Sequence, residues 1–220
     1  RHTNFSMETI QQTLNGTPAA SGTSTVTISR NGDLVYKVYV TSTDTAITKG
    51  SGLCTQVECE IGGQLIDRQY EEWNQIWWEL TTPASHWDGF KYMIGDASVN
   101  HAINKQLLGR VQVPLNFWFC RNPGLALPLI ALQYHEVKLK LTWSAAQSVS
   151  TSPEVWIDYI YLDTDERRRF AQVSHEYLIE QIQKQSANTT GSFKLTFNHP
   201  VKELIWTSSA DYGTAQLKLN

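Results

Sequence analysis

The stretch VQVPLNFWFCRNPGLALPLIALQYHEVKLK, residues 111–140, decides the fold class of this chain. Its first part alternates, and one face carries Val111, Val113, Leu115, Phe117 and Phe119. The other face carries Gln112, Pro114, Asn116 and Trp118. Residues 136–143 repeat the pattern, with Val137, Leu139, Leu141 and Trp143 opposite Lys138, Lys140 and Thr142. A period of two predicts strands, and Asn122-Pro123-Gly124 between them predicts a turn.

Short strand patterns also dominate the chain on either side of this stretch. They cover residues 6–14, 24–30, 33–41, 55–61, 154–162, 176–183, 192–198 and 201–207. Asn31-Gly32 separates two of them and predicts a hairpin. Helical patterns are limited to residues 69–80, with a stripe of Trp73, Ile76, Trp77 and Leu80, and to residues 164–171, with Thr164 as the N-cap. Many short strands with few helices predict an all-β sandwich or jelly roll.

The chain also resembles itself in three places. Residues 6–16 are similar to 174–185, residues 26–43 to 193–209, and residues 57–65 to 215–220. The matches occur in the same order, at an offset of about 155–170 residues, which indicates a duplicated sandwich. A second domain is therefore expected to begin near Val173.

Composition excludes several classes of protein. The chain has 220 residues, of which 41% are hydrophobic and 18% charged, so it can bury a core. A net charge of −3 and a pI near 6.1 argue against direct nucleic-acid binding. Three cysteines are too few for a disulfide framework and are expected to be reduced thiols. No apolar run approaches the ~18 residues of a transmembrane segment.

Residues 111–140 resemble the strand–turn–strand signature of major capsid proteins of nucleocytoplasmic large DNA viruses, particularly the algal-virus and mimivirus branch. Other stretches are similar to the same family in the right order. They are RHTNFSMETIQQTLNG (1–16), ISRNGDLV (28–35), VECEIGGQLIDRQYEEW (57–73), VWIDYIYLDTDERRRFAQVSHEYLIEQIQ (155–183) and LTFNHPVKELIW (195–206). The loops at 81–105 and 144–153 are expected to be variable connections.

The resemblance implies a tandem, or double, jelly roll. The first jelly roll is expected at 1–163, a short helical linker at 164–173, and the start of a second jelly roll at 174–220. A full family member would have another strand before Arg1 and would continue beyond Asn220.

The resemblance also implies a structural role in a virion. Three copies would form a pseudo-hexameric capsomer of an icosahedral shell assembled in the infected host cytoplasm. The expected partners are the chain itself as a homotrimer, neighbouring capsomers and minor capsid proteins. No cofactor and no enzymatic activity are expected. Candidate trimer contacts are the aromatic residues Trp73, Trp77, Trp87, Phe90 and Tyr92.

A few residue pairs also suggest catalytic or binding chemistry. His135-Glu136 and His175-Glu176 lack the second histidine, four residues on, of a zinc protease helix. Glu58 and Glu60 alternate on what is expected to be the solvent face of a strand, which leaves open a glycosidase-like pair. A carbohydrate-binding jelly-roll module is the alternative function. Asn4, Asn15 and Asn188 begin N-x-S/T sequons and are candidate glycosylation sites.

Overall fold

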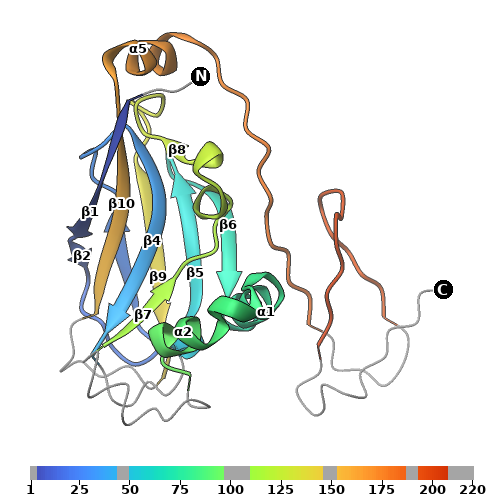
Figure 1. Cartoon of the computed structure of the whole chain (residues 1–220). Coiled ribbons are helices and arrows are strands. Elements are labelled where there is room, and N and C mark those ends of the chain that lie inside the picture. Colours follow the sequence, from blue (N-terminus) through green and yellow to red (C-terminus); the bar gives the residue numbers. More distant parts are fainter. Residues whose placement is uncertain (1–3, 44–49, 97–109, 146–152, 187–192, 208–220) are drawn as a thin grey trace. The chain divides into compact units, whose positions relative to one another are not determined.

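The computed structural model describes residues 4–43, 50–96, 110–145, 153–186 and 193–207. The chain divides into two compact units, residues 1–182 and 183–220. Within the described part of the first unit, two antiparallel sheets pack face to face (Figure 1).

The first sheet has the strand order β1-β10-β4-β7, with β8 also paired to β4. Its strands are β1 (Phe5–Gln12), β10 (Glu154–Leu162), β4 (Leu34–Ser42), β7 (Val111–Pro114) and β8 (Leu127–Pro128). The second sheet has the order β2-β3-β9-β5-β6. Its strands are β2 (Leu14–Asn15), β3 (Thr23–Thr27), β9 (Val137–Trp143), β5 (Cys54–Ile61) and β6 (Gln64–Tyr70). Strands distant in sequence are neighbours in both sheets, as a jelly roll requires.

Within the described residues, helices are confined to the segments between and after the strands. They are η1 (Gly50–Leu53), α1 (Glu71–Thr81), α2 (Ala84–Ile94), α4 (Trp118–Arg121), η2 (Pro123–Leu125) and α5 (Thr164–Gln172). The α5 helix lies at one end of the sandwich, whereas α1 and α2 lie at the opposite end (Figure 1).

The core lies between the two sheets because each strand turns alternate apolar residues inward. Leu139 and Leu141 of β9 are fully buried, as are Val38 of β4 and Ile157 and Tyr159 of β10. The alternation predicted for residues 136–143 is confirmed, since β9 buries every second side chain. Burying side chains of this size stabilises the sandwich by ~1.5–3 kcal/mol each.

The hairpin predicted at Asn31-Gly32 is wrong. The strands on either side of this turn belong to different sheets, because β3 pairs with β9 while β4 pairs with β10. Gly32 is required there by a close approach: a Cβ atom on it would lie 2.8 Å from the Cβ of Tyr159. The turn therefore carries the chain across the core from one sheet to the other.

The strand predicted from Val111 onward is shorter than its alternation. β7 ends at Pro114, and α4 follows over Trp118–Arg121. All side chains from Leu115 to Cys120 are buried, including Trp118 on the supposed outer face. A run in which every side chain is buried fits a turn of helix as well as a strand. The turn predicted at Asn122 is confirmed, since its side chain accepts a hydrogen bond from the Gly124 amide (2.8 Å).

The helix predictions hold with three corrections. The buried face of α1 is Asn74 and Trp78, so the predicted stripe is rotated, and Leu80 is 63% exposed. Part of the expected loop at 81–105 is the helix α2. The N-cap of α5 is Asp163, whose carboxylate accepts from the amide of Thr164 (2.7 Å).

Residues 173–186 and 193–207 contain no strand. The strands expected over 176–183 and 201–207, and over the described part of 192–198, are therefore not formed here. Within the second unit, glutamine side chains make the pairings instead. Gln185 accepts from the amide of Thr196 (2.9 Å), and Gln183 accepts from that of Asn198 (2.8 Å). A strand needs the backbone groups of a partner strand for its hydrogen bonds. Here the side chains of Gln183 and Gln185 accept the hydrogen bonds of backbone amides instead.

Candidate functional site: the outer surfaces of the sandwich

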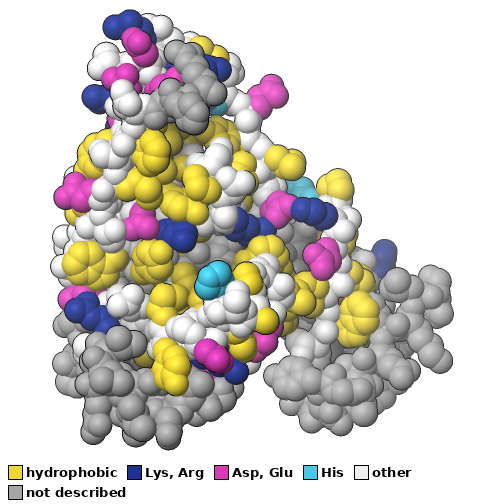
Figure 2. All heavy atoms as spheres, viewed as in Figure 1, with side chains coloured by type: hydrophobic (Ala, Val, Ile, Leu, Met, Phe, Trp, Pro, Cys, Tyr) yellow, Lys and Arg dark blue, Asp and Glu magenta, His cyan; other side chains and the backbone are white. Residues whose placement is uncertain are grey.

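The outer faces of the two sheets differ in character. On the β1-β10-β4-β7 sheet, the side chains that point away from the core include Phe5, Met7, Tyr39 and Trp156. In the strand register, Phe5 pairs with Leu162, Met7 with Ile160, and Tyr39 with Trp156. Figure 2 shows apolar side chains gathered over this face. Phe5 is 65% exposed and Met7 49%. Exposed apolar side chains grouped in this way are typical of an interaction surface.

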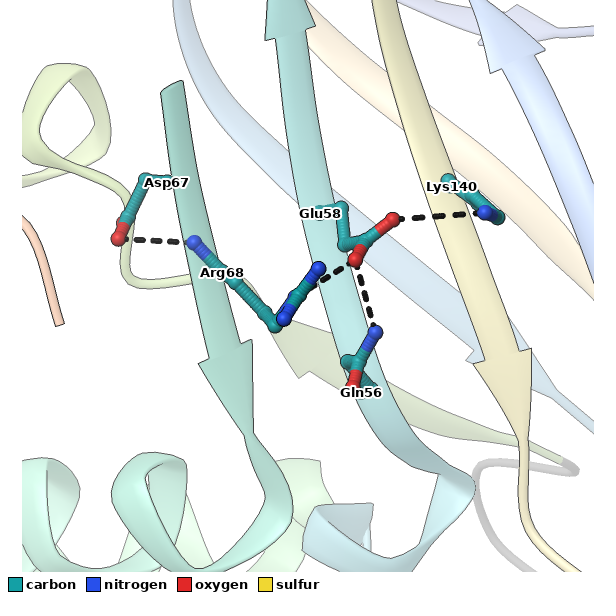
Figure 3. Close-up of polar contacts among 5 residues, drawn as sticks. All are labelled: Gln56, Glu58, Asp67, Arg68 and Lys140. Carbon is teal, nitrogen blue, oxygen red and sulfur yellow. Dashed lines mark hydrogen bonds and ion pairs between the residues drawn. The ribbon is translucent and has the colours of Figure 1, made fainter. Parts of the chain in front are cut away.

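The outer face of the second sheet is polar, and a four-residue cluster lies at its centre (Figure 3). Arg68 donates from Nε to the Glu58 carboxylate (2.6 Å), and Gln56 donates to the same oxygen (2.9 Å). Lys140 lies 3.6 Å from the other carboxylate oxygen. The four residues come from β5, β6 and β9, so the cluster links three neighbouring strands.

The expectation that Glu58 faces solvent is wrong. Its side chain is only 6% exposed, because the arms of Arg68 and Lys140 cover it. Glu60 is half-buried on the same strand. With the Glu58 carboxylate held between two cations, the geometry favours a structural ion-pair network over the freely approached pair of a glycosidase.

A second buried carboxylate lies on the inner side of β6, at the edge of the sheet. Asp67 accepts hydrogen bonds from the Ile182 amide (3.0 Å), from Gln69 (3.1 Å) and from the Arg68 amide (2.9 Å). Burial raises the pKa of Asp67, and these hydrogen bonds oppose the rise. The carboxylate thus attaches the extended segment after α5 to the edge of the first sandwich.

Two further contacts hold the same segment. Arg121 of α4 forms an ion pair with Glu180, and Gln181 donates to the carbonyl of Ile66. The Arg121 guanidinium also lies 4.0 Å from the ring centre of Trp77 and donates to the Asn116 carbonyl. The edge of β6 is therefore covered by side-chain contacts rather than by a backbone ladder.

The structure brings the five aromatic candidates together on the helix pair α1–α2. Trp73 stacks on Trp77 (5.5 Å), and Trp87 stacks on Phe90 (6.0 Å). Trp77, Trp87 and Phe90 are partly buried against the core, whereas Tyr92 is 43% exposed. Most of these aromatic side chains therefore pack within the chain, while part of their surface stays accessible to solvent.

Sequence reasoning missed Trp78 and Arg121, which organise that surface. Trp78 is 3% exposed and meets Phe90 edge-on (5.6 Å), which joins α1 to α2. Its spacing of four residues from the buried Asn74 was the available signal. Asn74 in turn accepts a hydrogen bond from the buried Asn116 (2.9 Å).

The cysteines and the two His-Glu pairs make contacts that are structural rather than catalytic. Cys54, Cys59 and Cys120 are buried free thiols, as predicted, and burial raises the pKa of Cys120 to about 12. Glu136 pairs with Lys138 (2.8 Å), and His175 contacts the Phe170 carbonyl (2.9 Å). Among the described residues no cluster of three or more acidic, histidine or cysteine side chains is arranged to hold a metal.

The candidate glycosylation sites are placed in part. Asn4 is exposed just before β1, and Asn15 is exposed on β2. Asn188 lies outside the described residues. In the part of the chain that the structure describes, no helix has the length and apolar character needed to cross a bilayer.

Comparison with known proteins agrees with this architecture. The family model for the major capsid protein N-terminus matches residues 1–163. The model for the large eukaryotic DNA virus major capsid protein matches residues 166–216. The major capsid protein of Pyramimonas orientalis virus is 49% identical, over all of this chain and 63% of the relative. That of Paramecium bursaria Chlorella virus 1 is 40% identical, over 94% of this chain and 53% of the relative.

Solved structures show the same likeness. A quasi-atomic model of the PBCV-1 virus capsid matches with a TM-score of 0.62 and 38% identity, over 83% of this chain and 48% of that chain. The Faustovirus major capsid protein shares the fold with a TM-score of 0.59 at 11% identity, over 77% of this chain and 56% of that chain. These matches bear out the predicted all-β, tandem jelly-roll fold class.

The chain spans about half to two thirds of the length of the curated relatives it matches. The match to the two family models nevertheless covers nearly all of its residues. This chain belongs to the family of major capsid proteins of large eukaryotic DNA viruses.

Proposed function

We propose that the protein containing this chain trimerises into pseudo-hexameric capsomers and builds an icosahedral virus shell. Its role is structural, without catalysis or a cofactor, and assembly takes place in the host cytoplasm. The observation that carries the proposal is the family match over residues 1–163, which coincides with a closed two-sheet sandwich. A rigid sandwich whose outer faces contact other proteins is suited to be the repeating unit of a shell.

The division of the chain follows the same proposal. The first jelly roll covers 1–163, the helical linker 164–173, and the second jelly roll starts at 174. The match to separate family models before residue 163 and after residue 166 supports this division. So does α5, which begins at Thr164 directly after β10.

The proposed partners are other copies of the protein, neighbouring capsomers and minor capsid proteins, without direct nucleic-acid contact. Trp73, Trp77, Trp87, Phe90 and Tyr92 remain the proposed aromatic contacts. The exposure of Tyr92 (43%) and Leu80 (63%) on the helix pair supports an interface there. The net charge of −3 argues against nucleic acid as a partner.

Light scattering of the full-length protein tests this function. We expect a trimer over a wide concentration range, together with hexagonal particles by electron microscopy. A protein that stays monomeric at every concentration would contradict the proposal. Glycan binding by a folded monomer would favour the carbohydrate-binding alternative, and hydrolysis abolished by Glu58→Gln or Glu60→Gln would favour an enzyme.

A further inference from the structure

An open pocket of about 360 Å³ lies at the end of the first sandwich that carries α5 (Figure 1). Pockets of this size hold small ligands or a few side chains of a partner. None of the aromatic or glycosylation candidates lines this pocket, so it belongs to no site described above. Its lining comes from the crossing turn at 30–33, from Leu129, Ile130 and Gln133 after β8, from the last two residues of β10, and from Arg167 of α5.

The charged side chains of the lining are two arginines and one aspartate. The carboxylate of the buried Asp33 already has a partner on each oxygen: Nε of Arg167 lies 2.9 Å from Oδ1, and the Leu162 amide donates to Oδ2 (2.8 Å). Arg30 donates from one Nη to the carbonyl of Leu132 (2.8 Å), which holds the guanidinium in place without neutralising its charge. The lining therefore carries an excess of positive charge.

The uncharged part of the lining is partly apolar and partly amide. Leu129 is buried and Ile130 is half-buried, whereas Asn31 and Gln133 are exposed and supply hydrogen-bond donors. A guanidinium binds a carboxylate through charge-assisted hydrogen bonds. The apolar side chains can at the same time cover methylene groups next to that carboxylate. The chemistry of the lining therefore fits a carboxylate on an aliphatic stem.

The charges around the pocket argue against a polyanion as the ligand. Asp165 and Glu166 stand beside the arginines of α5, and Arg168 lies 3.9 Å from Asp165. Tyr161, which also lines the pocket, donates its hydroxyl to Glu8 (2.9 Å). A phosphate backbone or an anionic membrane is bound by an extended cationic surface. Charges of alternating sign around the pocket favour a ligand with a single negative group.

An exposed aromatic side chain next to the pocket favours a protein as the source of that group. Tyr134 directly follows Gln133 of the lining and is 93% exposed. Tyrosine is enriched among the residues that contribute most to binding in protein interfaces. A partner that reached into the pocket would therefore find an aromatic contact beside it.

We propose that this pocket binds an acidic side chain of a partner protein. Arg30 and Arg167 hold the carboxylate, while Leu129 and Ile130 contact the aliphatic part of the bound segment. The partner is a protein that presents a glutamate or aspartate next to an aliphatic residue. The inference goes beyond the shell function and is independent of the aromatic contacts on α1 and α2, which lie at the opposite end of the sandwich (Figure 1).

Fluorescence anisotropy of the full-length protein tests the proposal with two labelled, end-blocked peptides. One is Gly-Leu-Glu-Leu-Gly, and its neutral counterpart is Gly-Leu-Gln-Leu-Gly. We expect the glutamate peptide to bind at least about tenfold more tightly, because only its carboxylate gains charge-assisted hydrogen bonds. Equal affinities, or no binding of either peptide, would overturn the inference. If inorganic phosphate binds but neither peptide does, the pocket takes free anions only and the inference is wrong.

Two variants locate the binding site of the peptide. Gln133→Glu adds a carboxylate at an exposed position of the lining and should weaken binding of the glutamate peptide by about fivefold through repulsion. Gln112→Glu makes the same change at an exposed position of β7, outside the lining, and should leave the affinity unchanged. Arg30→Gln should weaken binding by about tenfold with an unchanged melting temperature, since its guanidinium contacts a carbonyl rather than a buried acid. Unchanged affinity in both Gln133→Glu and Arg30→Gln would place the peptide elsewhere and refute the proposal.

Discussion

At the scale of single residues, the β5–β6 hairpin holds two buried carboxylates that differ in their surroundings. Glu58 faces outward and is neutralised by Arg68 and Lys140. Asp67 faces inward and is held by amide donors. Two cations contact the Glu58 carboxylate, whereas the Asp67 carboxylate lies among neutral donors, where burial carries a desolvation cost. The two side chains should therefore respond differently to substitution.

Removing the charge of Glu58 should destabilise the sandwich. A fully buried pair loses ~3–5 kcal/mol when one partner is removed, but Arg68 and Lys140 are 41% and 45% exposed and reach water. We therefore expect Glu58→Gln to lower the free energy of unfolding by about 1–2 kcal/mol in urea titrations. Glu60→Gln is the control and should change it by less than about 0.5 kcal/mol. Equal effects would contradict the network.

Asp67 should make stability depend on pH. Because burial raises its pKa in the folded state, the folded protein binds the proton more tightly than the unfolded chain. The stabilising contribution of the protonated form is thus lost as the pH rises through the folded pKa. We expect the stability of the wild type, relative to Asp67→Asn, to increase as the pH falls from 7 towards about 4. Urea titrations of both proteins at each pH measure this difference, in which other carboxylates cancel.

At the scale of elements, the turns decide which strands meet. The β5–β6 turn contains Gly62 and Gly63 with φ values of +61° and +82°, as a two-residue hairpin requires. The turn at Gly32 needs glycine for space instead, because Tyr159 lies against it. The same residue type thus serves a hairpin in one place and a crossing between sheets in the other.

Gly32→Ala should test this crossing. Its Cβ would lie 2.8 Å from the Cβ of the fully buried Tyr159, and overpacking of this kind costs ~1–3 kcal/mol. Gly89→Ala in α2 is the matched control, since nothing lies within 4 Å and the helix should gain about 0.5–1 kcal/mol. Thermal unfolding should therefore shift in opposite directions. A tolerated Gly32→Ala would show that the turn can move away from β10.

At the scale of the whole molecule, the three thiols report on the integrity of the core. Cys54 and Cys59 lie on β5 and Cys120 on α4, and burial raises the pKa of each. A thiol needs both its thiolate form and access to react. We expect no thiol to react with Ellman's reagent in the folded protein, and three after denaturation. Fast reaction of even one would show that the sandwich opens locally.

The fold class was predictable because period-two alternation is a local property of the chain. β9 and β10 were identified correctly over residues 137–143 and 154–162. The alternation failed over Leu115–Cys120, where every residue is buried and periodicity carries no information. The strands expected after residue 173 are also absent from the described residues, since a strand needs a partner that local pattern does not supply.

The residue types on the candidate surfaces were predictable, but their burial and contacts were not. The aromatic residues of α1 and α2 were visible in the sequence, but the buried Trp78 that joins the helices depends on how they pack. The carboxylate of Glu58 was visible as well, yet its burial depends on Arg68 and Lys140 from two other strands. A residue's exposure is set by side chains that arrive from distant parts of the chain.

The sequence by itself determined that this chain is an all-β jelly roll of the capsid protein family, because alternation and family signatures are encoded along the chain. Only the tertiary structure decided that the turn at Gly32 crosses between the sheets and that Asp67 binds the segment at Ile182. It also decided that apolar side chains gather over the outer face of one sheet, whereas an ion-pair cluster lies on the outer face of the other. The physical reason is that strand pairing brings together residues more than 100 positions apart, and which strands pair follows from the packing of the whole sandwich.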